Sequence, residues 1–278
     1  MSCADWVEDY LRHMDLTVEA PSVEYLSKIC TRHLATFPFE NISKLLYYRD
    51  LDKTGFLAPP PQLFVENYEG YQFGGTCFTL NGNLNRLLTA LGFNCHFVML
   101  SGEHMANVVR FGESVCYYVD CGAAAPFFTP VRLGTLPQIV QFGTDKIIIE
   151  PVDVDKHEYQ YRRFTGDEQN GKTWTFLASK RCTWEDFKSI LEAAHQPGTT
   201  FMSILRCQLW QPGRKRSVSL VDHTFTIRYQ NGQTQRYELT SMDDIKRVLA
   251  DEFGLPKLPV EEAVHVLEQL GVDIFRVH

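Results

Sequence analysis

The chain has 278 residues, of which 44% are hydrophobic and 22% charged, and its formal net charge is −7. This balance is typical of folded globular proteins and excludes a disordered or fibrous chain. Because acidic residues outnumber basic ones, we expect no nucleic-acid partner and no anionic membrane surface. The richest apolar runs are strand-sized and the start lacks the regions of a signal peptide, so we expect neither a spanning helix nor secretion.

Eight cysteines are spread along the chain, at positions 3, 30, 77, 95, 116, 121, 182 and 207. None belongs to a Cys-x-x-Cys pair, and the histidines match no zinc spacing, so we expect no metal site. We expect a cytoplasmic protein with reduced thiols, most of them buried as small apolar side chains. A catalytic role for any one cysteine therefore needs support from the residues around it.

The first third of the chain has the apolar spacing of helices. Helices are predicted over residues 4–14, over 22–34 with Ser22 as the N-cap, and over 77–91 with Gly92 just beyond. Pro38 ends the second of these, because the residue before a proline is disfavoured in a helix. The stretch from Pro59 predicts a loop or a short helix.

The middle of the chain changes to strand-like segments separated by turn residues. Strands are predicted over residues 95–100, 104–111, 115–120, 158–164 and 172–177. Gly112 and Glu113 fall in the turn between the second and third strands. Thr183 and Asp186 form a capping-box pattern, which predicts a helix that ends near residue 194.

The last third combines strands and helices. Strands are predicted over residues 204–211, 218–220, 224–229 and 234–239, followed by helices over 241–249 and 259–271. An Asn231-Gly232 pair is the strongest hairpin signal in the chain. The order of helices, then strands, then both predicts an α+β fold with boundaries near residues 85 and 195.

One short segment carries the clearest chemical signal, Gly74-Gly75-Thr76-Cys77. Paired glycines allow a tight backbone turn, and Cys77 follows at the start of a predicted helix. Unpaired N–H groups and the helix dipole favour a thiolate there, and the thiolate is the nucleophilic form. The same segment is also compatible with a loop beside a buried thiol.

His104 and Asp120 lie on neighbouring predicted strands and strengthen the catalytic interpretation. A cysteine nucleophile needs an imidazole to take its proton, and the imidazole needs a carboxylate to orient it. Side chains alternate along a strand, so His104 and Asp120 share a face only if the turn between their strands holds an odd number of residues or the ladder contains a bulge. Singly, each residue is equally compatible with a structural role.

Several motifs together resemble the arylamine N-acetyltransferase family. They are His33 followed by Phe37-Pro38-Phe39-Glu40-Asn41, then Phe73-Gly74-Gly75-Thr76-Cys77-Phe78, then His104-Met105, then Tyr118-Val119-Asp120-Cys121-Gly122. They occur in the family's order, and the chain length also fits. No motif after residue 195 contributes to the resemblance.

The resemblance implies a fold, a reaction and a set of site residues. The fold is a helical bundle over residues 1–85, a β-barrel-like domain over 86–195 and an α/β lid over 196–278, with a cysteine-protease-like core. The reaction moves acetyl from acetyl-coenzyme A to an arylamine or arylhydrazine through a thioester on the cysteine. The implied catalytic residues are Cys77, His104 and Asp120. Phe39, Gly75, Phe127 and Phe128 are expected to contact substrate, although buried packing is the stronger alternative for Phe127 and Phe128. We expect no metal, and a monomer or homodimer as the assembly.

The chain departs from the family pattern at three places. Phe73 stands where members usually carry arginine, so Glu40 needs another partner or contact with solvent. Ala123 and Ala124 replace the usual Phe-Gly pair, although the phenylalanine lines the acceptor pocket in the family. The segment between Cys77 and His104 is also shorter than usual. None of these changes alters the proposed triad itself.

Two alternatives remain open from the sequence. The same triad order serves amide-bond hydrolases and transglutaminase-like enzymes, so an amide synthase or amidase is the enzymatic alternative. A catalytically impaired homologue that only binds small aromatics or a partner protein is the other, and the changes at positions 73, 123 and 124 motivate it.

Overall fold

The computed structural model describes residues 5–171 and 173–276. Residues 4 and 172, where we placed the starts of the first helix and of one strand, lie outside this part of the chain, as does Cys3. Within it, no helix is both long and apolar enough to cross a lipid bilayer.

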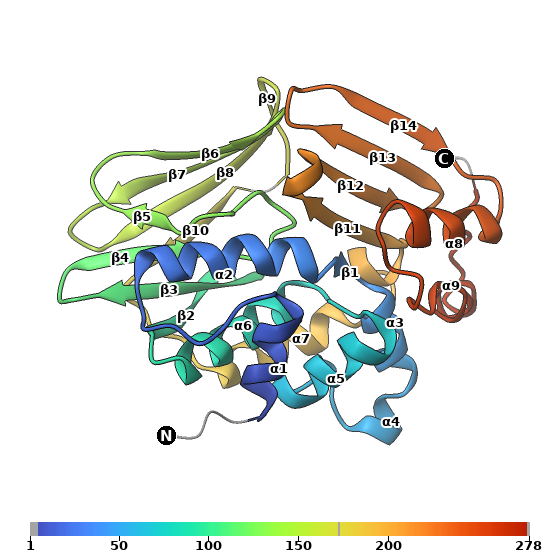
Figure 1. Ribbon diagram of the computed structural model, residues 1–278, viewed down its shortest axis with the longest axis horizontal. Helices are drawn as coiled ribbons and strands as arrows, with labels where there is room; N and C mark the ends of the chain where they lie inside the picture. Colours follow the sequence, from blue (N-terminus) through green and yellow to red (C-terminus); the bar gives the residue numbers. More distant parts are fainter. Residues whose placement is uncertain (1–4, 172, 277–278) are drawn as a thin grey trace.

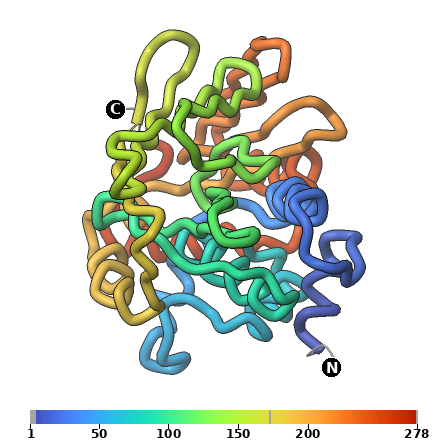
Figure 2. Tube along the Cα trace, turned by 90° about the vertical axis from the view of Figure 1, so that its left-hand side faces the viewer, coloured from blue at the N-terminus to red at the C-terminus, as the bar shows by residue number. Residues whose placement is uncertain are grey.

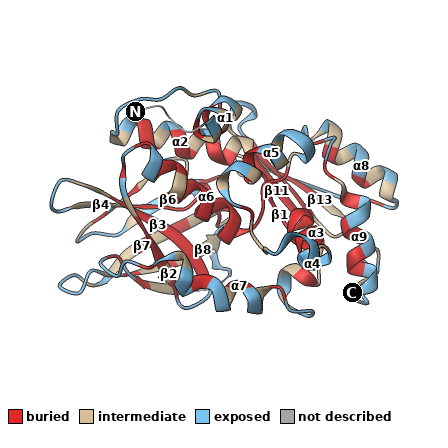
Figure 3. Ribbon diagram, turned by 90° about the horizontal axis from the view of Figure 1, so that it is seen from below, coloured by how far each residue is buried: buried red, intermediate tan, exposed pale blue. Residues whose placement is uncertain are grey.

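The helices of the first third lie together below three sheets (Figure 1). They are α1 (Asp5–His13), α2 (Val23–Thr36), α3 (Ile42–Arg49), α4 (Leu51–Thr54), α5 (Pro61–Tyr71) and α6 (Cys77–Ala90). Ser22 caps α2 as predicted, because its hydroxyl accepts a hydrogen bond from the Tyr25 N–H at 3.0 Å. Helix α2 runs along the long axis of the molecule and is seen end-on in Figure 2. Helix α6 is buried on nearly all sides and lies at the centre of the fold (Figure 3).

The fourteen described strands form three sheets. One sheet has the order β2-β3-β4-β5, with β2 (Asn94–Leu100), β3 (His104–Phe111), β4 (Val115–Val119) and β5 (Val131–Leu133). A second has the order β10-β8-β7-β6, with β9 paired to β8; its strands are β6 (Gln138–Phe142), β7 (Asp145–Asp153), β8 (Glu158–Thr165), β9 (Glu168–Gln169) and β10 (Trp174–Leu177). The prediction missed β5, β6 and β7.

These two sheets correct the expected barrel. The Ser101 N–H donates to the Thr175 carbonyl at 3.0 Å, so the edges of the sheets meet near β2 and β10. Neither sheet closes on itself, and in the described chain no ladder joins β5 to β6. The barrel-like description is therefore wrong, and the fold is α+β with open sheets.

The third sheet joins the two ends of the sequence. Its order is β1-β11-β12-β13-β14, with β1 (Phe39–Glu40), β11 (Arg206–Gln211), β12 (Arg216–Val221), β13 (Thr224–Tyr229) and β14 (Thr234–Glu238). Phe39 pairs with Gln208, so a segment of the helical region becomes an edge strand of the C-terminal sheet. Helices α8 (Met242–Asp251) and α9 (Val260–Gln269) complete this region, and apolar residues of α3 share their core.

A short helical segment precedes the C-terminal sheet. The capping box at Thr183 is confirmed, but it begins a 3₁₀ turn over Trp184–Phe187 that continues into α7 (Lys188–Ala194). Further 3₁₀ turns cover Thr200–Met202 and Pro212–Arg214.

The turn between β3 and β4 places His104 and Asp120 on one face. Phe111 pairs with Val115, so residues 112–114 form a three-residue turn. Because the turn is odd, the register is even and both side chains point to the same side of the sheet. The turn of odd length, which the shared face of His104 and Asp120 requires, is confirmed.

Gly74 and Gly75 join the Pro38–Glu40 segment to the start of α6. The Gly75 N–H donates to the Pro38 carbonyl at 3.3 Å, and the Glu40 N–H donates to the Gly75 carbonyl at 3.1 Å. A Cβ atom at Gly74 would lie 1.9 Å from the Pro38 carbonyl oxygen. The two motifs of the sequence are therefore one structure, in which glycine permits two backbones to touch.

We predict opposite effects on stability for two glycine-to-alanine substitutions. Gly74→Ala should lower the free energy of unfolding by about 3 kcal/mol, because the new methyl group overlaps a backbone carbonyl that cannot move freely. Gly70→Ala is the control: it lies in α5 with open space around it, and alanine should raise stability by about 0.5–1 kcal/mol. Urea unfolding of both variants measures this. Equal stability of Gly74→Ala and the unchanged protein would contradict the close contact between Gly74 and the Pro38 carbonyl.

Candidate active site

Cys77 is the first residue of α6 and opens onto a cavity of about 530 Å³. The cavity is lined by Cys77 and His104, together with residues of α3, α7 and the segment around residue 200. The prediction that this cysteine begins a helix is confirmed. A side chain at this position sits beside the unpaired N–H groups of the first helical turn, where negative charge is favoured.

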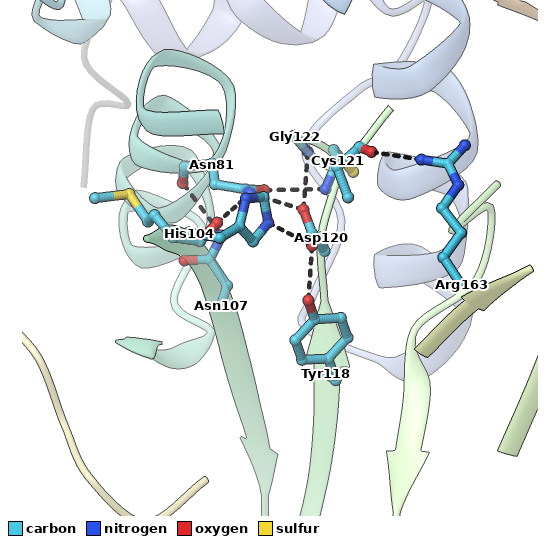
Figure 4. Close-up of polar contacts among 10 residues, drawn as sticks. Asn81, His104, Asn107, Tyr118, Asp120, Cys121, Gly122 and Arg163 are labelled. Atoms are coloured by element: carbon cyan, nitrogen blue, oxygen red, sulfur yellow. Dashed lines mark hydrogen bonds and ion pairs between the residues drawn. The ribbon is translucent and has the colours of Figure 1, made fainter. Parts of the chain in front are cut away.

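His104 and Asp120 form a buried pair (Figure 4). The His104 Nε2 atom lies 2.8 Å from Asp120 Oδ2, and both side chains are almost completely buried. Since Nε2 faces the carboxylate, Nδ1 is the ring nitrogen left for the cysteine sulfur. Cys77 and His104 line the same cavity, and a negative charge on Cys77 raises the pKa of His104.

The carboxylate of Asp120 receives three further hydrogen bonds. Its Oδ2 accepts from the Tyr118 hydroxyl at 2.6 Å, and its Oδ1 accepts from Asn81 Nδ2 at 2.8 Å and from the Gly122 N–H at 3.0 Å. Burial alone favours the neutral acid, but the charge and the hydrogen bond of His104 outweigh burial and hold the pKa of Asp120 below its usual value. Asp120 is therefore a fixed negative charge under the imidazole.

The pKa of His104 moves in the opposite direction. Burial disfavours the imidazolium, but the charge of Asp120, followed by that of Cys77, outweighs burial and raises the pKa of His104 to about 10. The imidazole also stacks on Trp174, with ring centroids 4.6 Å apart and planes 3° from parallel. Stacking on an aromatic face stabilises the protonated form of the ring. The site therefore supports an imidazolium beside the thiolate.

Asn81 fastens the nucleophile helix to the sheet that carries the acid. It lies one turn beyond Cys77, and its side chain donates to Asp120 and to the Met105 carbonyl and accepts from the Cys121 N–H. A Cβ atom at Gly122 would lie 2.7 Å from the Cys77 Cα atom, so the two backbones are in contact there. Sequence reasoning missed Asn81. The signal was present, because asparagine recurs at positions 81, 83 and 85 of an otherwise apolar helix.

Glu40 has found partners in place of an arginine. It is fully buried and accepts from the Ser43 hydroxyl at 2.6 Å, the Ser43 N–H at 2.8 Å and the Gly74 N–H at 3.1 Å. Burial raises the pKa of Glu40 to about 6 in spite of these bonds. Phe73 is buried against Tyr47 and Tyr71. The first departure from the family pattern is therefore absorbed by neutral donors and aromatic packing.

The aromatic lining of the cavity differs from the prediction. Phe39 lines it as expected, and Phe78, Trp174 and Phe201 do so as well. Nothing in the local sequence marked Trp174 or Phe201, which come from distant segments. Ala123 also lines the cavity, and its small side chain leaves space beside Cys77.

Three of the expected substrate contacts lie outside the cavity lining. Phe127 packs in the core against Tyr118 and Tyr161, and Phe128 packs against Phe142 and Trp210. Neither ring lines the cavity that contains Cys77, because both are committed to aromatic packing elsewhere. Gly75 does not line the cavity either. Its φ of +138° and its contact with Thr79 shape the turn before Cys77.

The loop beyond Asp120 is held in an unusual conformation. Ala124 has φ of +52°, in the left-handed region where glycine is favoured. Its carbonyl accepts from Arg163 Nη2 at 3.0 Å and from Gln208 Nε2 at 2.9 Å, which fixes the loop against two sheets. Glycine, which the resemblance leads us to expect here, adopts this conformation without strain, whereas this chain places alanine in it.

Comparison with known proteins shows which protein family the chain belongs to. The family model described as N-acetyltransferase matches residues 22–258, so the chain belongs to this family. It is 26% identical over 266 residues to the arylamine N-acetyltransferase of Escherichia coli (strain K12). The matched region covers 88% of this chain and 86% of that protein. It is also 26% identical over 199 residues to proansamycin X synthase of Amycolatopsis mediterranei (strain S699), covering 66% of this chain and 72% of that one. The family expected from the motifs is confirmed.

A solved structure shares the whole fold. The arylamine N-acetyltransferase of Mycobacterium marinum in complex with CoA is similar with a TM-score of 0.72, at 17% identity, over 95% of this chain and 97% of that one. The likeness extends through the C-terminal sheet, where the sequence contained no recognisable motif.

We predict that Cys77 is alkylated before the other described cysteines. Burial raises the pKa of Cys95, Cys121, Cys182 and Cys207, which slows their reaction. Cys77 has His104 beside it to take its proton. Iodoacetamide labelling of the native protein at mildly acidic pH, followed by peptide mass mapping, measures the order. His104→Gln is the control and should remove the advantage; faster labelling of Cys95 or Cys121 in the unchanged protein would contradict the assignment.

Proposed function

We propose that the protein transfers acetyl from acetyl-coenzyme A to the nitrogen of an arylamine or arylhydrazine, with Cys77 as the nucleophile. The observation that carries this proposal is the meeting of Cys77, at the start of α6, with the buried His104–Asp120 pair at one cavity. Family membership and the similar CoA-bound structure support acetyl-coenzyme A as the donor.

In the donor half-reaction, the thiolate of Cys77 attacks the thioester carbonyl of acetyl-coenzyme A. A new C–S bond forms to Cys77 and the C–S bond to coenzyme A breaks. The departing thiolate takes the proton from the His104 imidazolium and leaves as the free thiol. The products are acetyl-Cys77, coenzyme A and neutral His104, so the proton and the charges balance.

In the acceptor half-reaction, the amine attacks the carbonyl of acetyl-Cys77. His104 takes a proton from the amine nitrogen while the C–S bond to Cys77 breaks. The amide leaves, and the thiolate–imidazolium pair is restored. Asp120 keeps its charge throughout and holds the ring in the orientation that leaves Nδ1 free for the sulfur.

The cavity favours an aromatic acceptor. Phe39, Phe78, Trp174 and Phe201 present aromatic surface next to Cys77. We place the enzyme in the cytoplasm as a monomer or homodimer, in keeping with its reduced cysteines, and we retain three domains divided at residues 85 and 195 as a proposal. An amide synthase is the second candidate, because a relative named a synthase matches the chain with the same identity as the acetyltransferase of Escherichia coli.

A burst experiment tests the proposed function. The protein is mixed with excess acetyl-coenzyme A without acceptor, and free coenzyme A is followed with a thiol reagent after removal of the protein. We expect a rapid release of one coenzyme A per chain, followed by slow hydrolysis, and no burst from Cys77→Ser. A folded protein with no burst would instead support the amide-bond alternatives or a homologue that only binds.

We predict that the Asp120 carboxylate and the Tyr118 hydroxyl bonded to it contribute unequally to the rate of the burst. Asp120→Asn should slow acylation by about 10³–10⁴-fold, because the amide cannot stabilise an imidazolium. Tyr118→Phe removes one hydrogen bond to the same oxygen but leaves the charge, so the loss should stay within about tenfold. Stopped-flow rates of coenzyme A release measure both. A similar loss in the two variants would show that packing, rather than charge, is what Asp120 supplies.

We predict that the unchanged protein acetylates Cys77 readily but turns over simple anilines slowly and with little selectivity. Hydrazines should react better because they are stronger nucleophiles. Ala123→Phe should improve aniline turnover by about 10–200-fold, since the ring restores apolar contact beside Cys77. Steady-state rates compared with single-turnover acylation separate the two half-reactions. Fast and selective aniline turnover by the unchanged chain would show that Phe39 or Phe201 already supplies this wall.

A further inference from the structure

A lysine that the triad does not use faces the same cavity. Lys44 lies on α3, its side chain is only 4% exposed, and it lines the cavity together with Cys77. Its ammonium donates to the Ala194 carbonyl at 2.7 Å. A buried ammonium is costly unless it is paired, so this position calls for an explanation.

Lys44 has no carboxylate partner in the part of the chain that the structure describes. The nearest ring nitrogen, His195 Nδ1, lies 3.5 Å away, but the same atom is 2.7 Å from the Leu191 carbonyl and must therefore carry its hydrogen. Burial, reinforced by the charge of Lys44, lowers the pKa of His195 to about 4, so this ring is neutral. Neither the Ala194 carbonyl nor the His195 ring therefore neutralises the ammonium.

The negative group that Lys44 does sense is the Cys77 thiolate. Burial lowers the pKa of Lys44 to about 8, and the charge of Cys77 acts in the opposite direction. Acetylation removes that charge from the sulfur. In the acetyl-enzyme, the state that receives the acceptor, Lys44 therefore loses its negative neighbour, and an anion brought by the acceptor would restore one.

We infer that Lys44 binds a carboxylate on the acceptor, so that the acetyl-enzyme selects arylamines that carry an acidic substituent. The inference rests on the proposed function and adds the substrate class. The donor is the less suitable source of the anion, because it enters while the thiolate is present and its phosphates are many bonds from the thioester. A carboxylate seated on Lys44 would complete the hydrogen bonds of the ammonium and replace the lost charge.

The test compares acceptors that differ in charge but little in shape. For each isomer of aminobenzoate, kcat/KM is divided by that of the matching aminobenzamide. Differences in intrinsic amine reactivity cancel when this ratio is compared between variants. We expect Lys44→Met to lower the ratio by about 10–100-fold for the isomer that the unchanged protein prefers. Lys44→Arg should keep most of the preference.

A matched control separates this effect from a change of net charge. Lys188→Met, on α7, removes a lysine whose side chain is 54% exposed and paired with Glu185, and its ratio should equal that of the unchanged protein. A drop of the same size in Lys188→Met would overturn the inference. So would an unchanged ratio in Lys44→Met.

The pH dependence gives a second readout. The ratio should fall as pH rises in the unchanged protein, because burial lowers the pKa of Lys44 to about 8 and acetylation removes the opposing charge of Cys77, and it should persist to higher pH in Lys44→Arg. Cys77, His195, His104 and Glu103 also face Lys44 or the shared cavity. Cys77 carries the acetyl group in the acetyl-enzyme and Lys44→Arg retains the other three, so only the pH dependence that differs between the unchanged protein and Lys44→Arg reports on residue 44. A ratio that does not change with pH would contradict the inference.

The outcomes also separate a failure of this inference from a failure of the proposed function on which it rests. If acetyl-coenzyme A produces no burst, the proposed function fails and the substrate class fails with it. If the burst occurs and neutral and acidic acceptors show the same ratio in every variant, the acetyltransferase stands and the role of Lys44 is wrong.

Discussion

The fully buried carboxylate of Asp120 is the constraint on which the site depends. An unpaired carboxylate in such a place would cost several kcal/mol, so the surrounding structure must supply positive charge and hydrogen bonds. His104, Tyr118, Asn81 and the Gly122 N–H do so from one helix, two strands and one loop. Satisfying one carboxylate therefore fixes the nucleophile helix against the sheet and orients the imidazole at the same time.

Backbone contacts then set where the sulfur lies. Gly122 lets the loop after β4 touch the start of α6, and Gly74 lets the Pro38–Glu40 segment touch the turn before Cys77. The latter segment continues as β1 in the C-terminal sheet. The catalytic helix is thus held by the sheet that carries the acid and, through β1, by the sheet at the far end of the sequence. This arrangement explains why glycine motifs distant in sequence belong to a single site.

The sequence predicted the features that depend on local pattern or on parity. Apolar spacing located α2 and α6, and the odd turn between β3 and β4 was enough to put His104 and Asp120 on one face. Strands β5 and β6 were missed because β5 has only three residues and the alternation in Gln138–Phe142 is weak, whereas the apolar run in β7 was strand-sized but was not assigned. The barrel was wrong because sheet closure depends on how strand edges meet, which no local pattern records.

The cavity walls were harder to predict than the triad. Trp174, Phe201 and Lys44 reach the cavity from three distant segments, so only the folded chain brings them together. Phe127 and Phe128 had suitable chemistry but are used in core packing. Motifs therefore located the proposed reacting groups, whereas the residues that line the cavity around them follow from tertiary packing. The division into three domains remains a prediction, and the core shared by α3 and the C-terminal helices crosses one of its boundaries.

The central claim is that His104 is an imidazolium held between Asp120 and the Cys77 thiolate in the resting enzyme. NMR of the imidazole nitrogens, with the His104 signal assigned through His104→Gln, measures this directly. The account predicts a protonated ring through neutral pH, with a pKa of about 10, and a lower pKa once Cys77 is alkylated and its charge is gone. A ring that titrates near the ordinary value of about 6.5, or whose pKa is the same before and after alkylation, would contradict the account.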